Sequence, residues 1–185
     1  DPVLQQVEHF NNPGITANDA FKPVTRYFDR ITRPEQIIQS FPNAVQTMLD
    51  PADCGPACIS LCQDIQGQTF DYPEEFFIEK IHSIRRPRPD DFQIKEAAEK
   101  IKNSKNPIII SGGGVFYSNA MEELSNFAIK HNIPVTQTVM GYSTMKRDHS
   151  HYAGQIGGLG GKNTNDLAKE TDLAIAVGTK LADFT

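Results

Sequence analysis

The sequence lacks the features that would place it in a membrane, on nucleic acid or outside the cell. It has no run of about 18 apolar residues, so no segment is long enough to cross a bilayer as a helix. No basic segment followed by an apolar stretch opens the chain, so no secretory signal is visible. The formal net charge is only -5, and the one basic cluster, Arg85-Arg86-Pro87-Arg88, is smaller than the face that binds nucleic acid. We therefore expect neither a membrane nor a nucleic acid as partner.

Cysteine is scarce as well, and its three copies do not form a known ligand pattern. Cys54, Cys58 and Cys62 lie four residues apart, which on a helix would place all three thiols on one face. Gly55-Pro56 disfavours a helix there, and zinc sites combine two close pairs of ligands. We expect a buried strand over 57–62 with small core cysteines, and no metal site. The lack of a disulfide framework is typical of a cytoplasmic protein.

The chain divides into two segments of different character. Residues 1–78 contain a segment that Pro34 opens and in which apolar residues recur every three or four positions up to Leu49, which predicts a helix. Residues 79–91 are rich in proline and charge, which favours a connector over the surface. Residues 92–185 begin a second domain. Because the first residue is not Met, we expect an internal start.

The second segment alternates helices and strands. Asp90 or Asp91 can cap a first helix, whose expected buried face is Ile94, Ala97, Ala98 and Ile101. The elements expected after it are a strand at 108–111, a helix capped by Asn119 and Glu122, a strand at 133–138, a long loop at 139–161, a short helix at 163–170 and a strand at 172–177. Short helices between strands predict parallel pairing with right-handed crossovers. The fold class is therefore α/β with a Rossmann-like parallel sheet, which at three strands we expect to be incomplete.

A glycine turn is the main candidate for a ligand site. Gly112, Gly113 and Gly114 follow a strand and precede a helix, which is where parallel sheets place their ligands. Glycine lets the backbone approach a phosphate, and amides at a helix start attract anions. The dinucleotide fingerprint needs another glycine where Tyr117 stands, so an NAD site is not expected. A structural tight turn and a pocket for another nucleotide remain alternatives.

Two other patterns do not meet the requirements of a site. Counting back from Gly161-Lys162 places Ile156 at the first glycine of a phosphate loop and Asn163 at its hydroxyl position, so that motif is rejected. His149 and His151 are interpreted as exposed loop residues, because no further metal ligands accompany them. By itself the chain contains no complete active site.

Several sequence segments resemble, in the same order along the chain, segments of thiamine-diphosphate enzymes of the acetolactate synthase type. Gly55–Ile65 is similar to the end of their pyrimidine-binding domain, and Asn106–Gly114 is similar to the start of their central domain. Ile133–Thr138 and Asp172–Thr179 resemble later parts of that domain. The phrases at 33–36, 63–66 and 71–73 further resemble the family member that acts in inositol catabolism.

The resemblance implies a fragment of a larger enzyme. Residues 1–78 would be the C-terminal part of the pyrimidine-binding domain and 92–185 the first part of the central domain. The parent would be a hydrolase that uses thiamine diphosphate and magnesium to open the ring of a cyclic dione by cleaving a carbon–carbon bond. The residues that hold both groups are expected outside this chain, so no catalytic residue or metal ligand is expected within it, and the chain alone is expected to be inactive.

The resemblance also concerns the central domain, which in some relatives holds FAD or ADP. Gly112, Gly113, Gly114, Met140 and Gly141 are the residues expected to line such a pocket, although neither nucleotide is strongly expected here. The family forms dimers or tetramers, which implies a cytoplasmic homo-oligomer.

The sequence departs from the family pattern at two places, and two alternative interpretations of the chain remain open. Gly141-Tyr142-Ser143 replaces a frequent Gly-Lys-Gly, and Cys62 stands where proline is usual. The open alternatives are a fragment of an acetolactate-synthase-like carboligase and a stand-alone α/β nucleotide-binding module.

Overall fold

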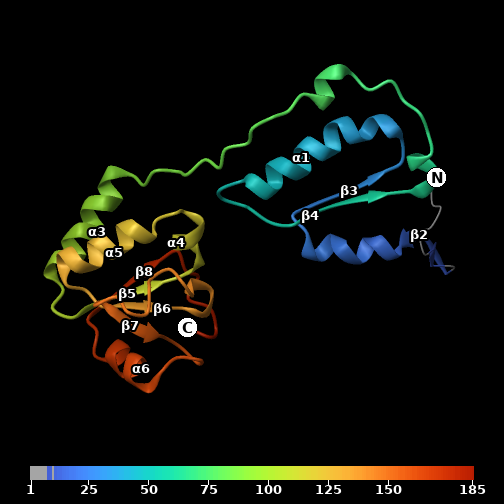
Figure 1. The fold of residues 1–185 in the computed structure, drawn as a ribbon. Coiled ribbons are helices and arrows are strands. Elements are labelled where there is room, and N and C mark those ends of the chain that lie inside the picture. Colours follow the sequence, from blue (N-terminus) through green and yellow to red (C-terminus); the bar gives the residue numbers. More distant parts are fainter. Residues whose placement is uncertain (1–7, 10) are drawn as a thin grey trace. The chain divides into compact units, whose positions relative to one another are not determined.

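A computed structural model describes residues 8–9 and 11–185; residues 1–7 and 10 lie outside it. The chain forms two compact units that divide between Pro87 and Arg88, inside the segment 79–91 expected to be a connector. Each unit has a parallel sheet and a core of its own (Figure 1). No helix in the described part of the chain is both long and apolar enough to span a membrane.

The first unit is built on two parallel strands joined by a helix. β3 (Tyr27–Ile31) pairs with β4 (Ala57–Leu61), and α1 (Ile37–Leu49) connects them. The predicted helix and the strand after it are therefore confirmed, but the expected burial of that strand is wrong, since only Ser60 of β4 is buried and Leu61 is exposed. A small core of Ile31, Cys62 and Ile65 lies beside this pair. The remaining elements are β1 (Glu8–His9), β2 (Asn12–Thr16), η1 (Ala17–Val24), η2 (Pro34–Gln36), α2 (Gln63–Gln66) and η3 (Glu74–Phe77).

The apolar stripe of α1 is covered only in part. Ser40 and Ala44 are its buried residues, whereas Phe41 and Met48 are exposed. Periodicity therefore predicted the helix correctly without predicting how much of its surface is buried. The physical reason is that the described part of this unit offers α1 only two paired strands.

The three cysteines have three different environments. Cys62 is fully buried, Cys58 on β4 is half-buried and Cys54 is exposed, and none of the three forms a disulfide with a described residue. The expectation of three core cysteines is therefore wrong for Cys54. Its thiol lies outside the strand and donates to the carbonyl of Met48 at the end of α1.

The second unit is a four-stranded parallel sheet in the order β7-β6-β5-β8. Helices α3 and α5 lie on one side of this sheet and α6 on the other (Figure 1). This arrangement confirms the predicted α/β fold class. The elements are α3 (Asp91–Asn103), β5 (Pro107–Ser111), α4 (Gly113–Tyr117), α5 (Met121–His131), β6 (Val135–Gln137), η4 (Val139–Gly141), β7 (Tyr152–Gln155), α6 (Lys162–Lys169) and β8 (Leu173–Val177).

β5 separates two apolar layers, since alternate residues of a strand face opposite sides of a sheet. On the side of α5, Ile109 belongs to the larger cluster, together with Leu124 and Ala128. Ile108 and Ile110 face the other way and pack with Ile156, with Ala168 of α6 against them.

β7 was not predicted, because residues 139–161 were expected to be one long loop. Gly154 lies within the strand at φ +108°, a conformation that favours glycine and interrupts any strand-like pattern. The strand forms because β6 offers an unpaired edge, along which Tyr152, Gly154 and Gln155 align with Val135, Thr136 and Gln137. This contact is tertiary and leaves little trace in local sequence.

The two predicted helix caps have opposite outcomes. Of the two residues expected to cap α3, Asp90 does so, since its carboxylate accepts a hydrogen bond from the Phe92 amide at 2.8 Å. The prediction for Asn119 is wrong: this residue has φ +55° in the turn between α4 and α5, and Ala120 stands at the start of α5.

The expected buried face of α3 is also wrong for most of its residues. Ile94, Ala97 and Ala98 are exposed, and only Ile101 is half-buried. α3 is thus amphipathic in sequence but has no fully buried residue in the structure.

Candidate functional site

A crevice of about 600 Å³ lies beyond the carboxyl ends of the strands in the second sheet. Gly113 and Gly114 follow β5, Thr138–Met140 follows β6, and Leu159 follows β7. Gly178–Lys180, after β8, completes this part of the wall. The crevice has the position that open parallel sheets give to their ligands.

All five residues expected from the sequence gather at this end of the sheet. Gly113, Gly114 and Met140 line the crevice directly. Gly112 and Gly141 lie behind that wall, where a side chain on Gly141 would overlap the carbonyl of Ser111 and approach Gly112. The structure therefore brings the glycine turn and the Met140-Gly141 pair together. Gly113, Gly114 and Met140 line the crevice, whereas Gly112 and Gly141 support its wall.

The glycine turn after β5 packs backbone to backbone against the turn after β8. The amide of Gly112 donates to the carbonyl of Val177, and the amide of Gly114 donates to the carbonyl of Gly178, both at 2.9 Å. A Cβ on Gly114 would lie 2.6 Å from the Cα of Gly178, closer than real contacts allow. Glycine is needed here because another part of the same chain occupies the space.

This packing argues against a phosphate cradle in the glycine turn. An anion site needs amides that point outward without a partner. The amides of Gly112 and Gly114 already donate to strand-end carbonyls, and the amide of Val115 donates to the carbonyl of Gly112. Three amides of the turn are therefore not available to the diphosphate of FAD or ADP, and α4 is only five residues long.

The lining of the crevice is mostly apolar. Tyr117, Met140, Leu159 and Phe184 are exposed around it, while Lys180 is its only charged lining residue among those described. Sequence reasoning missed Leu159 and the segment after β8. A signal for the latter existed, because Gly178-Thr179-Lys180 follows a strand just as the first glycine turn does.

A buried polar network fixes the loop behind the crevice. The hydroxyl of Ser111 donates to the hydroxyl of Thr144, which in turn donates to the carbonyl of Gly141, each at 2.7 Å. The side-chain Nε2 of Gln137 donates to the carbonyl of Met145 at 2.9 Å. These bonds tie the ends of β5 and β6 to the loop that follows η4.

Tyr142, one of the departures from the family pattern, lies outside this network. Its side chain is exposed, its hydroxyl accepts a hydrogen bond from Arg147 at 3.2 Å, and the same guanidinium lies 5.5 Å from the ring centre. The side chain of Tyr142 therefore lies at the surface against Arg147 and does not line the crevice.

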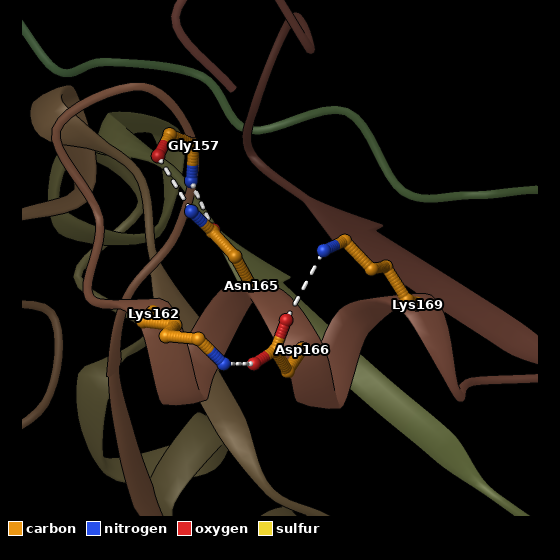
Figure 2. A network of polar contacts seen from close by, with 5 residues as sticks. All are labelled: Gly157, Lys162, Asn165, Asp166 and Lys169. Carbon is orange, nitrogen blue, oxygen red and sulfur yellow. Dashed lines mark hydrogen bonds and ion pairs between the residues drawn. The ribbon is translucent and has the colours of Figure 1, made fainter.

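The glycine-rich loop before α6 is held by its own helix, as Figure 2 shows. Asn165 binds the backbone of Gly157, and Lys162 forms an ion pair with Asp166 at 2.5 Å. The hydrogen bonds from Lys162 and Lys169 lower the pKa of the Asp166 carboxyl. The lysine of the rejected phosphate-loop motif is thus paired with a carboxylate on the next turn.

Ser125 and His149 form a pair that resembles a catalytic dyad but lacks its chemistry. The Oγ of Ser125 lies 2.9 Å from Nε2 of His149. Nδ1 of His149 accepts a hydrogen bond from the amide of His151, so in the neutral ring the proton is on Nε2, which donates to the serine. A base would need the opposite tautomer. His149 and His151 are half-buried, so the expectation that they are exposed is wrong.

No group of three or more His, Cys, Asp or Glu residues that could hold a metal ion occurs in the described part of the chain.

Comparison with known proteins identifies two levels of similarity. Residues 94–185 match the family model described as thiamine pyrophosphate enzyme, central domain; thiamine pyrophosphate and thiamine diphosphate are the same cofactor. Over all 185 residues the chain is 50% identical to a 3D-(3,5/4)-trihydroxycyclohexane-1,2-dione hydrolase of Clostridium perfringens (strain 13 / Type A). The protein of that name from Bacillus subtilis (strain 168) is 45% identical over 184 residues. The chain spans 29% of the length of each relative.

Proposed function

We propose that the whole protein is a ring-opening hydrolase of the thiamine pyrophosphate enzyme family, whose central-domain model matches residues 94–185. Its substrate would be 3D-(3,5/4)-trihydroxycyclohexane-1,2-dione or a close analogue, formed during inositol catabolism. Water would be consumed as a carbon–carbon bond of the ring breaks. Thiamine diphosphate, held with magnesium by residues elsewhere in the protein, would supply the electron sink for that cleavage.

The observation that carries this proposal is the extent of the identity. Half of all 185 residues are shared with a relative named for this activity, whereas the family model covers only residues 94–185. The similarity therefore includes the first unit and the connector, which the central-domain family does not define. A carboligase that shared only the central domain would not be expected to match along the whole chain.

The role of this chain in such an enzyme would be structural. Its described residues offer no metal cluster, and the candidate serine–histidine pair has the wrong tautomer for a base. The crevice at the carboxyl end of the second sheet would be scaffold and not a nucleotide site, because the amides of Gly112 and Gly114 are already bonded within the chain. The reduced state of Cys54, Cys58 and Cys62 supports a reducing compartment such as the cytoplasm.

The decisive experiment is an activity assay of the full-length protein with two substrates. Purified protein is incubated with thiamine diphosphate and magnesium and given either the cyclic trihydroxydione or pyruvate. Loss of the dione with appearance of an open-chain acid, dependent on thiamine diphosphate, is the expected result. Turnover of pyruvate alone would identify a carboligase instead. Protein-bound FAD, detected by its absorbance after denaturation, would contradict the scaffold role of the crevice.

A further inference from the structure

His149 connects α5 to the start of β7 within the second unit. Its Nε2 lies 2.9 Å from the Oγ of Ser125 on α5, and its Nδ1 accepts a hydrogen bond from the amide of His151 at 3.1 Å. Its carbonyl accepts a further hydrogen bond, at 2.9 Å, from the amide of Tyr152, the first residue of β7. This one residue therefore ties the end of the loop after η4 to a helix and to a strand.

The strand held in this way is short and irregular. β7 has four residues, pairs only with β6 among the described strands, and shifts its register between Val135 and Thr136. The carbonyl of His151 accepts a hydrogen bond from the amide of Val135 at 2.8 Å, so the residue that donates to Nδ1 of His149 also bonds to β6. The start of β7 therefore depends on the contacts that His149 and His151 make.

Protonation of His149 is incompatible with one of these contacts. A neutral imidazole has one nitrogen that donates and one that accepts, whereas an imidazolium donates from both. A proton on Nδ1 would face the amide of His151, which is also a donor, so the hydrogen bond between them would be lost. The contact with Ser125 would remain, because Nε2 carries a proton in both states. Histidine side chains change charge between about pH 5 and 8.

His151, two residues away, does not have this incompatibility. Its Nε2 lies 3.1 Å from Oδ1 of Asn132, and its Nδ1 lies 2.9 Å from the Oγ of Ser150. Both partners are oxygen atoms that can accept, so a protonated His151 ring keeps both contacts. The two rings have centres 5.8 Å apart but respond differently to acid.

The charged groups near His149 do not replace the lost hydrogen bond. No carboxylate in the described part of the chain forms an ion pair with His149. The guanidinium of Arg147 is engaged with Tyr142. The charged residues one turn before Ser125 on α5 and next to His149 in its loop are Glu122, Lys146, Arg147 and Asp148.

We propose that His149 is a pH-sensitive switch that releases the start of β7 in acid. In the neutral state its Nδ1 holds the amide of His151, and the first pair of β7 with β6 stays closed. In the protonated state this hydrogen bond is absent, and the pair opens more often. Because β7 leads to Leu159, the release also loosens one wall of the crevice. This inference does not depend on the proposed activity.

The test is amide hydrogen exchange of the full-length protein at several values between about pH 5 and 8, the range in which histidine changes charge. Mass spectrometry reads the exchange, and division by the intrinsic rate at each pH gives the protection. Protection of residues 149–155 should fall by about three- to tenfold toward the acid end, because one hydrogen bond is lost. Protection of β5 should not change, so β5 is the internal reference.

Matched variants assign the effect to one ring. In His149→Asn, the side-chain oxygen can accept from the amide of His151 at every pH, so the fall in protection should disappear. His151→Asn, the same change two residues away, should keep the fall, as should Ser125→Ala, which leaves Nδ1 of His149 in place. Circular dichroism confirms that each variant is folded.

Three results would overturn the proposal. The first is constant protection of residues 149–155 in the original protein over the whole pH range, which needs no variant. The second is a fall in His149→Asn as large as in the original protein. The third is an equal fall in β5, which would mean that acid opens the whole sheet and not the start of β7.

Discussion

Asn165 holds the backbone of Gly157 with both atoms of its side-chain amide. Its Oδ1 accepts from the Gly157 amide and its Nδ2 donates to the Gly157 carbonyl, both at 3.0 Å (Figure 2). Gly157 has φ +92° and begins the loop that places Leu159 at the crevice. Through this pair of bonds, α6 fixes one wall of the crevice.

Removing this pair of bonds should loosen the loop locally. For Asn165→Ala in the full-length protein, we expect the free energy of local opening to fall by about 1–2 kcal/mol, because two backbone groups lose their partner. The measurement is amide hydrogen exchange at Gly160 and Gly161, whose amides bond within the same loop. Asn163→Ala is the control, since Asn163 is exposed on the same helix. Unchanged exchange in Asn165→Ala would show that the side-chain bonds do not support the loop.

Gly178 should tolerate no side chain. It has φ +60°, and a Cβ there would lie 2.6 Å from the amide nitrogen of Val115. We expect Gly178→Ala to lower the free energy of unfolding by more than about 1 kcal/mol, from both backbone strain and overlap. Gly67→Ala is the matched control, because Gly67 has φ -83° and its nearest neighbour is 3.9 Å away. Urea unfolding compares the two, and equal midpoints would contradict the close packing of the two turns.

The hydroxyl of Thr144 should be necessary for the loop behind the crevice. Thr144→Val preserves the shape but leaves the hydroxyl of Ser111 and the carbonyl of Gly141 without this partner in a buried site. The expected loss of stability is about 1–3 kcal/mol, the cost of burying polar groups that lack hydrogen bonds. Urea titration measures it. Ser118→Ala, at an exposed position, should change little. A fully stable Thr144→Val protein would mean that the network contributes nothing.

Asp172 should make the stability of the second unit depend on pH in the acid range. Its carboxylate accepts hydrogen bonds from the hydroxyl of Ser104 and from the amides of Lys105 and Asn106. These bonds, that of Ser104 first, hold the pKa of Asp172 below its ordinary value of 3.8. Because the pKa is lower in the folded than in the unfolded state, the carboxylate stabilises the fold above pH 3.8. This contribution is lost as the pH falls through the folded pKa.

The corresponding variant tests the sign of this effect. Asp172→Asn should be less stable than the original protein near neutral pH, and the difference should shrink as the pH falls below 3.8. Thermal unfolding over a pH series measures both curves. Asp183→Asn, at an exposed position near the end of the chain, should give parallel curves. A difference that grew toward low pH would reverse the assigned direction.

Local sequence predicted those parts of the fold that depend on neighbouring residues. The periodicity after Pro34 predicted α1, and the carboxylate of Asp90 predicted the start of α3. Resemblance to a family predicted the grouping of Met140 with the glycine turn, a grouping that spacing alone does not provide. β7 could not be predicted in this way, because it exists only where β6 offers an edge.

By itself, the sequence determined the α/β class, most helices and strands, and the position of a glycine turn after β5. Each of these depends on backbone preferences and apolar spacing within a few residues. Only the tertiary structure decided that the amides of Gly112 and Gly114 are already bonded and that the apolar side of α3 is open. Both depend on which distant segments meet: the turn after β5 meets Gly178, more than sixty positions later, while Ile94 stays 48% exposed. Glycine permits a close backbone contact and isoleucine favours burial, but packing across the whole fold decides which segment makes the contact and which side chain is covered.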